Sequence, residues 1–254
     1  MFLYLVRDFI DYIDELIIKT DKRLFPLLKR TLGDKNIRYI DKKQQIDEAN
    51  YDFHIAMGSL PKYLRSSLKS FHDAKQFILK VDQNQSDQIR HQLLDDQFDK
   101  IIGISWKSYS TSIKNKSLSL EQFVLGINSP KIKFVCLQYG EVKEEIKHLK
   151  TKYGIEVYEM EEIDKFNDID SLSALIKACD EVISIGNITV PLAGALGCNC
   201  KALMIKNNSW WWGNNDTHSY WYSSIKLFRQ TENGEWNHPL KQIKEEIKLI
   251  DSDS

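Results

Sequence analysis

Short runs rich in β-branched residues alternate with helical segments through most of this chain, and that alternation constrains its fold more than any other feature. In the second half, five runs have the length and composition of buried strands. They are residues 100–106, 131–138, 154–160, 181–185 and 201–205. Helical segments lie between them, at 120–127, 141–149, 170–178 and 191–197. Strands that alternate with helices in this way predict βαβ units and a parallel α/β sheet.

The first part of the chain shows a similar but weaker alternation. Strands are predicted at 15–20, 36–40 and 52–58, and helices at 2–10, 21–33 and 86–98. Each part holds enough units for a sheet of its own, so we predict two domains, 1–98 and 99–254. A doubly wound domain normally begins with a strand and a ligand-binding loop. Because the chain opens in a helical pattern, the N-terminal domain is expected to lack its first strand.

The bulk composition excludes several classes of protein. The chain has 254 residues and a formal net charge of −1, which disfavours nucleic acid and anionic membranes as partners. No apolar run is long enough to span a bilayer, and no signal peptide precedes the first charged residues. The four cysteines have no zinc-site spacing, which predicts no metal, and the apolar runs around Cys136 and Cys179 predict buried thiols at these two positions. A reducing cytoplasm is the expected compartment. No serine-hydrolase, P-loop or dinucleotide-binding motif is present.

Polar residues follow several of the predicted strands at the point where each strand ends. In a parallel sheet these ends share one edge, where ligands usually bind. The residues are Ser105, Trp106 and Lys107 after the first strand of the second domain, Gln138, Tyr139 and Gly140 after the second, and Gly186, Asn187, Ile188 and Thr189 after the fourth. A basic loop with Lys114 and Lys116 follows the first of these strands. Lysines, amides and hydroxyls together would suit a phosphorylated, nucleotide-like ligand.

The stretch EVISIGNITVPLAGALG, residues 181–197, joins a strand to a small-residue helix through a tight turn. Free backbone N–H groups at the start of such a helix can bind an anion, so the turn is a candidate phosphate site. The alternative is a plain strand–helix connection with Pro191 at the first helical position. Likewise, Lys116 could be a solvated loop lysine, and Gln138 could cap a turn.

Residues 209–230 are unusually aromatic, and Trp210, Trp211, Trp212 and Trp221 lie there. Aromatic side chains combine a large apolar area with a polar handle. This segment either lines a sugar or base site or packs onto its own domain. A third possibility is an α/β interaction domain that uses these tryptophans as a partner surface.

A set of short motifs resembles the bacterial glycosyltransferases of the heptosyltransferase-like GT-B class. The most similar branch is the one associated with tetratricopeptide repeats and related to O-linked N-acetylglucosamine transferases. The motifs are GISWKS, KSLSLEQF, FVCLQYG, DIDSLSALIKACDEVISIGNITVPLAGALG, SWWW, YWYSSIKLFRQ and GEWNHPLKQI.

The resemblance implies two Rossmann-like domains. The N-terminal domain would bind a glycan, lipid or protein acceptor, and the C-terminal domain a nucleotide-diphospho-sugar. Lys116 matches the position of a basic residue on the diphosphate, and would act in catalysis by stabilising the departing nucleoside diphosphate. Hexosyl or heptosyl transfer to a cell-envelope glycan would then need no metal and no cofactor beyond the sugar donor.

Two departures from that pattern favour an alternative. Pro191 stands where the class usually has a histidine, so one phosphate contact is missing. The first strand and its glycine loop, which contribute to the acceptor side, find no counterpart before residue 1, and we assign no catalytic base. The alternative is an inactive nucleotide- or glycan-binding remnant of the same fold.

Overall fold

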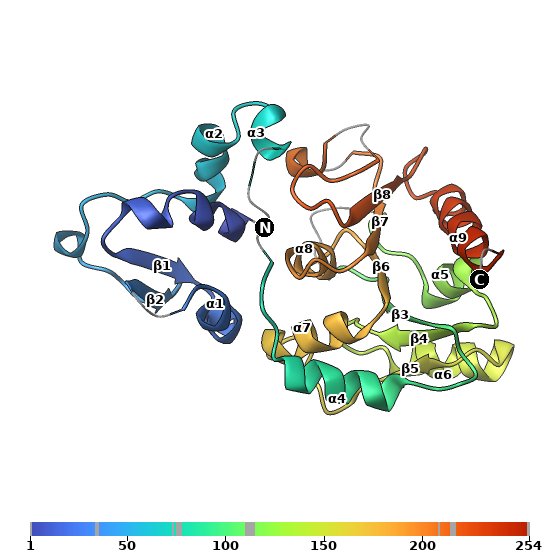
Figure 1. Ribbon diagram of the computed structural model, residues 1–254. Coiled ribbons are helices and arrows are strands. Elements are labelled where there is room, and N and C mark those ends of the chain that lie inside the picture. Colours follow the sequence, from blue (N-terminus) through green and yellow to red (C-terminus); the bar gives the residue numbers. More distant parts are fainter. Residues whose placement is uncertain are drawn as a thin grey trace. The chain divides into compact units, whose positions relative to one another are not determined.

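The computed structural model describes residues 2–33, 36–72, 74, 78–109, 115–207, 209–213 and 217–252, the last five of these by backbone alone (Figure 1). The chain divides into two compact units, Met1–Val81 and Asp82–Ser254. In the described residues each unit contains one parallel sheet, with two strands in the first and six in the second.

The division falls after residue 81, whereas the sequence pattern placed it after residue 98. The difference is the helix α4 (Gln83–Leu93), which packs against α7 (Ile169–Ala178) of the second unit. Arg90 donates a hydrogen bond of 2.7 Å to the carbonyl of Ala178 and pairs with Asp180 at 2.6 Å. Because its contacts are with α7, α4 belongs to the second unit.

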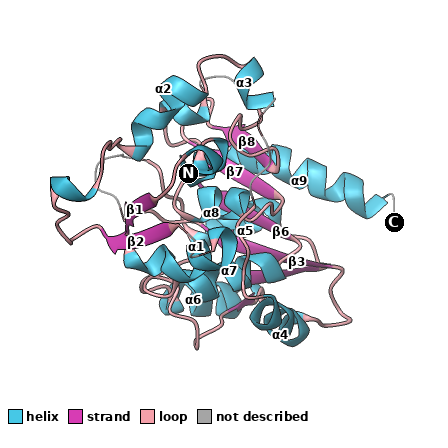
Figure 2. Cartoon of the chain, turned by 60° about the vertical axis from the view of Figure 1, so that its left-hand side comes forward, coloured by secondary structure: helices cyan, strands magenta, loops and turns pink. Residues whose placement is uncertain are grey.

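The larger sheet has six parallel strands in the order β5-β4-β3-β6-β7-β8. The strands are β3 (Lys100–Ser105), β4 (Ile132–Cys136), β5 (Val157–Tyr158), β6 (Glu181–Ile185), β7 (Cys200–Met204) and β8 (Ile225–Arg229). Figure 2 shows β3, β6, β7 and β8 side by side. The first strand in sequence thus lies in the middle, beside the fourth, as in doubly wound folds. The predicted α/β class with parallel sheets is confirmed.

Helices cover both faces of this sheet (Figures 1 and 2). One face carries α5 (Leu120–Ile127), α6 (Lys143–Tyr153) and α9 (Asn237–Ser252), and the other carries α4, α7 and α8 (Thr189–Ala195). Ile102 and Ile104 of β3 belong to the core cluster under α5 and α9, which contribute Phe123 and Ile243. The strands are buried on both faces, which explains their continuous apolar runs.

A buried ion cluster closes the edge of the sheet where the strands begin. Glu181, at the start of β6, pairs with Lys100 of β3 at 2.7 Å and with Lys201 of β7. The side chains of Glu181 and Lys201 are 6% and 8% exposed. The single carboxylate of Glu181 therefore serves as the shared ion-pair partner of two strand lysines, of which Lys201 is almost fully buried.

The two outer edges of this sheet differ from its centre. Residues 217–219 run along the outer side of β8, through hydrogen bonds from the Leu227 amide to the Thr217 carbonyl (2.7 Å) and from the Ser219 amide to the Ile225 carbonyl (3.2 Å). His218 forms an antiparallel bridge with Lys226. At the other edge, β5 has only two residues.

The first unit contains one βαβ element, in which β1 (Leu16–Thr20) and β2 (Ile37–Asp41) pair in parallel and α1 (Phe25–Leu32) connects them. Shorter helices complete it: η1 (Phe2–Asp8), η2 (Ile10–Tyr12), η3 (Lys22–Leu24), η4 (Glu48–Asn50), η5 (Met57–Ser59), α2 (Leu60–Leu64) and α3 (Lys69–His72). The predicted helix over 2–10 is thus made of tighter 3₁₀ turns. The predicted strand over 52–58 is wrong, because this segment pairs with neither strand and leaves Phe53 exposed.

All four cysteines are free, buried thiols, which confirms the prediction made for Cys136 and Cys179. Burial raises the pKa of Cys136 to about 11. A thiol that stays protonated is neither a nucleophile nor a good metal ligand.

Candidate functional site

Gln138 holds the end of β3 in place. Its side-chain oxygen accepts hydrogen bonds from the Ser105 hydroxyl (2.9 Å) and from the amides of Trp106 (3.1 Å) and Lys107 (2.8 Å). Its Nε2 donates to the Tyr139 carbonyl at 3.0 Å. Gln138 is 1% exposed, so its polar atoms are used within the protein. The residue therefore positions the loop after β3 and is not available to bind a ligand.

Asn187 makes the matching connection from β6. Its Nδ2 donates to the Ser105 hydroxyl (2.7 Å) and the Lys107 carbonyl (3.2 Å). Its Oδ1 accepts from the Ser184 hydroxyl (3.2 Å) and the Thr189 amide (3.0 Å). The side chains of Gln138 and Asn187 thus hold the chain at the ends of β3 and β6. The strand order changes direction between these two strands, and open α/β sheets bind ligands at such a point.

The backbone amides of the 186–191 turn are largely occupied by the turn itself. The Asn187 amide donates to the Ile185 carbonyl at 2.6 Å, and the Thr189 amide is taken by the Asn187 side chain. Pro191 has no N–H. Ile188 is 52% exposed, and its amide donates to no group in the described part of the chain. The predicted phosphate contacts from residues 187–189 therefore reduce to one available amide.

Lys116 lies next to this turn. A Cβ placed on Gly186 would be 3.9 Å from Lys116 Cε, so the lysine stem passes over the end of β6. Lys116 is half-buried and makes neither an ion pair nor a hydrogen bond within the described ranges. Burial lowers the pKa of Lys116. The strand ends thus present a partly desolvated cation that has no anionic partner among the described residues. Lys114 lies outside the described residues.

The loop that carries Lys116 is closed at its base. The Leu118 amide donates to the Trp106 carbonyl at 3.2 Å, and the Ser108 amide donates to the Ser117 hydroxyl at 2.9 Å. Gln230, after β8, donates from Nε2 to the Asn115 carbonyl at 3.3 Å. These bonds place Lys116 although it lies in an irregular segment.

Two residues predicted to bind ligand have structural partners instead. Lys107 forms an ion pair with Glu145 of α6, and the Trp106 indole donates to the same carboxylate at 3.1 Å. Trp106 is fully buried. Glu145 lies 38 residues beyond Lys107, and no local pattern identifies this pairing.

Tyr139 belongs to an aromatic cluster that the sequence reasoning missed. Its ring centroid lies 5.2 Å from that of Tyr109 and 5.4 Å from that of Phe166. Gly140, at φ +87°, lies under the Tyr109 ring, and a Cβ there would collide with the Tyr109 hydroxyl. The signal that could have identified the cluster is an aromatic residue in each of the three segments that follow β3, β4 and β5.

The tryptophan-rich segment mainly packs onto its own unit. It forms the short helix η6 (Trp210–Trp212), in which Trp212 is buried and accepts a hydrogen bond from Arg229 at its carbonyl. Trp221 is also buried, and Trp210 contacts it edge to face at 6.1 Å. Trp210 itself is 60% exposed. Most of this aromatic content is therefore core.

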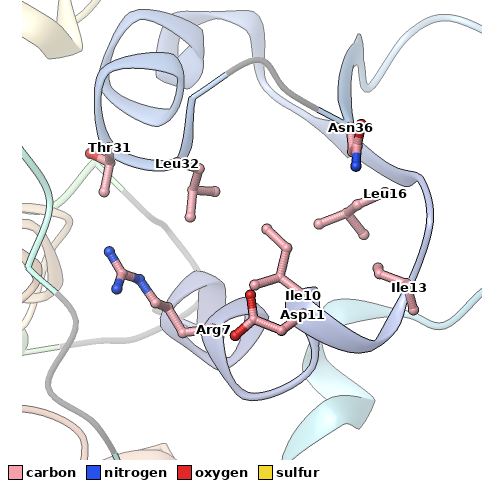
Figure 3. Close-up of a pocket in the computed structure, with 8 residues that line it drawn as sticks. All are labelled: Arg7, Ile10, Asp11, Ile13, Leu16, Thr31, Leu32 and Asn36. Atoms are coloured by element: carbon pink, nitrogen blue, oxygen red, sulfur yellow. The ribbon is translucent and has the colours of Figure 1, made fainter.

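The first unit has an open cavity of about 460 Å³ (Figure 3). It lies where β1 and β2 begin, near Leu16 and Asn36, and Arg7 and Asp11 bring charged groups to its rim. Ligands of parallel sheets normally bind where strands end. This cavity is therefore a weaker candidate than the edge carrying Lys116.

In the described ranges, no group of three or more His, Cys, Asp or Glu residues is arranged to hold a metal ion. No helix in those ranges is both long and apolar enough to cross a bilayer.

Comparison with known proteins connects the fold to glycosyltransferases. The structure resembles that of E. coli ADP-heptose lipopolysaccharide heptosyltransferase II, with a TM-score of 0.57 and 13% identity, over 100% of this chain and 94% of that one. It also resembles a glycosyl transferase family 9 protein from Veillonella parvula, with a TM-score of 0.53 and 12% identity, over 98% of this chain and 76% of that one. The chain therefore has the two-domain, Rossmann-like GT-B fold.

Comparison of sequences alone does not assign the chain to a family. No family model matches the chain. Protein FlbA of Caulobacter vibrioides is 27% identical over 247 residues, which cover 90% of this chain and 40% of that protein. The chain thus spans about two fifths of the length of this relative. None of these proteins is named for tetratricopeptide repeats or O-linked N-acetylglucosamine transfer, so that finer resemblance stays a prediction.

Proposed function

We propose that this protein is a glycosyltransferase that takes a sugar from a nucleotide-diphospho-sugar and passes it to a glycan, lipid or protein acceptor. The observation that carries the proposal is Lys116, a half-buried cation without an anionic partner in the described residues, at the reversal point of a doubly wound sheet. The fold shared with glycosyltransferases supports it.

In this proposal Lys116 binds the diphosphate of the donor. When the bond between the sugar and the diphosphate breaks, negative charge grows on the leaving phosphate. A preplaced ammonium group in a partly desolvated site stabilises that charge more than water does. The Ile188 amide, which has no acceptor in the described part of the chain, supplies a second donor at the same place.

A donor-binding remnant without transfer activity is the second candidate. The backbone amides of Asn187 and Thr189 already have acceptors, and Pro191 has no N–H to donate. Such a turn gives a diphosphate fewer contacts than a turn with free amides. Sugar release from a nucleotide sugar, measured with the full chain, separates the two: binding without release over long incubation favours the remnant.

Replacing Lys116 with methionine tests the binding site. Methionine keeps most of the stem and removes the charge. A charge-assisted contact contributes about 1.5–3 kcal/mol, so calorimetry with UDP, ADP, GDP and pyrophosphate should show about a 10- to 100-fold loss of affinity. The free energy of unfolding should stay equal or rise, because a partly buried charge is removed.

Lys131→Met is the matched control, because Lys131 is exposed and pairs only weakly with Asp99 at 3.5 Å. It should leave all affinities unchanged. If Lys116→Met binds every diphosphate as tightly as the wild type does, Lys116 is not the anion site.

The same site should respond to pH. The pKa of Lys116 is lowered from 10.5 by burial, so the ammonium is lost at a lower pH than in an exposed lysine. Pyrophosphate affinity should therefore fall as pH rises toward 10.5, and the Lys116→Met variant should lack this component.

As pH rises, the contribution of Lys116 to stability changes in the opposite direction to its contribution to pyrophosphate affinity. Between the folded and unfolded pKa values the unfolded chain binds more protons, so the contribution of this lysine to the free energy of unfolding rises with pH. The buried ammonium destabilises the folded state fully at a pH below the pKa of Lys116 in the folded state. This effect is absent at a pH above its pKa in the unfolded state. Identical pH profiles of affinity in wild type and variant would contradict the assignment.

A further inference from the structure

The cluster of Tyr109, Tyr139 and Phe166 is exposed at the edge where the strands end. Tyr109 and Phe166 are 51% and 53% exposed, and Tyr139 lies between them with its ring in contact with both. The three residues follow β3, β4 and β5, which are neighbours in the sheet. The rings of Tyr109 and Phe166 are tilted by 41° and 43° to that of Tyr139, and such exposed rings offer apolar faces on which a planar ligand can stack.

The loop that carries Phe166 is held by its own side-chain hydrogen bonds. The Asp164 carboxylate accepts from the amides of Phe166 (3.0 Å) and Asn167 (2.9 Å). Its second oxygen accepts from the Asn167 side chain at 2.9 Å. A ring that is already ordered loses little conformational entropy when a ligand stacks on it.

Tyr109 and Lys116 lie on the two arms of one loop, beside the residues that follow the two strands flanking β3. Both lie one residue beyond the Ser108–Ser117 hydrogen bond, on the two arms of the loop. Tyr109 lies over Gly140, after β4, whereas Lys116 lies beside Gly186, after β6. Since β4 and β6 flank β3, they are about 10 Å apart. A nucleoside diphosphate has a matching layout, because its ribose separates the base from the phosphates as β3 separates Tyr109 from Lys116.

We propose that Tyr109, Tyr139 and Phe166 form a stacking surface for the nucleobase of the donor. The inference rests on the proposed function, because Lys116 must bind the diphosphate for the base to reach these rings. Stacking on aromatic side chains tolerates different bases, since every base has a π-face. The surface therefore explains affinity for nucleosides in general and leaves selectivity among bases to other contacts.

Calorimetry on the full chain tests this with Tyr109→Ala, Phe166→Ala and Lys116→Met. The probes are UDP, ADP, GDP, UDP-glucose and pyrophosphate. Tyr153→Ala is the control, because Tyr153 is a partly exposed tyrosine at the end of α6, where its hydroxyl bonds Glu121 and its ring lies under Lys152. Both aromatic side chains are at least half exposed, so folding should survive, and thermal unfolding checks this.

Each aromatic variant should lose at least about fivefold in affinity for the nucleoside diphosphates and keep its affinity for pyrophosphate. Tyr109→Phe should restore UDP binding, because stacking needs only the ring. Lys116→Met should weaken every probe.

Unchanged affinity for all three nucleoside diphosphates in both aromatic variants overturns the stacking surface. If Lys116→Met still has a lower affinity for pyrophosphate than the wild type, the proposed donor site is retained. Loss of UDP-glucose affinity alone means that the rings hold the sugar, which also overturns it. If the wild type binds no probe, the donor site itself is wrong and the stacking surface with it.

Discussion

Replacing Glu181 with glutamine is expected to destabilise the unit of residues 82–254 by about 3–5 kcal/mol. Glutamine has nearly the same shape but no charge, so the buried Lys201 side chain would lose its counter-ion. Most of the loss should come from Lys201, which is 8% exposed, because Lys100 is 21% exposed and reaches water. All six tryptophans lie in this unit, so tryptophan fluorescence during urea unfolding measures its stability selectively.

A double variant separates loss of charge from loss of packing. Glu181→Leu combined with Lys201→Met removes the buried pair together, and such replacements are often neutral or stabilising. It should recover most of the stability lost in Glu181→Gln. If the single variant loses less than about 1 kcal/mol, the cluster is no more than a surface ion pair.

Gln138→Met should cost about 3 kcal/mol and should also weaken diphosphate binding. Methionine fills a similar volume but accepts no strong hydrogen bond, so the Ser105 hydroxyl and the amides of Trp106 and Lys107 lose their common acceptor. The cost for each buried donor is about 1–3 kcal/mol, and the Lys107 amide, near solvent, should contribute least. The loop base that places Lys116 begins at these residues.

Gln122→Met provides the control, because it makes the same change on the exposed side of α5, where the side chain has one weak contact of 3.4 Å. It should change stability by no more than about 0.5 kcal/mol. Urea unfolding and pyrophosphate calorimetry measure both variants. Equal effects at 138 and 122 would show that Gln138 does not organise the strand ends.

The second unit was largely predictable because its strands are buried on both faces. Continuous apolar runs between helices identify such strands without knowledge of their neighbours, and α5 was predicted at its observed bounds. The helix α9 was missed although Leu240, Ile243 and Ile247 have helical spacing. The strand β8 was missed because it follows an aromatic segment interpreted as a loop.

The first unit was harder because its elements are short and half exposed. Alternating residues over 52–58 resemble a strand, yet a strand also needs a neighbour, and sequence spacing does not reveal one. At the candidate site, the sequence placed the right residues at the strand ends but not their roles. Whether Asn187 meets a ligand or Ser105, 82 residues away, depends on the tertiary fold.

The covered outer side of β8 and the shortness of β5 have a consequence for self-association. A long, bare outer strand invites pairing with the same strand of another molecule, which is a common route to aggregation. Here residues 217–219 already bond the Ile225 carbonyl and the Leu227 amide on the outer side of β8, and the two residues of β5 are too few to seed growth at the other edge. Cutting the chain before β8 would bare β7, and the truncated protein should precipitate where the intact one stays dispersed.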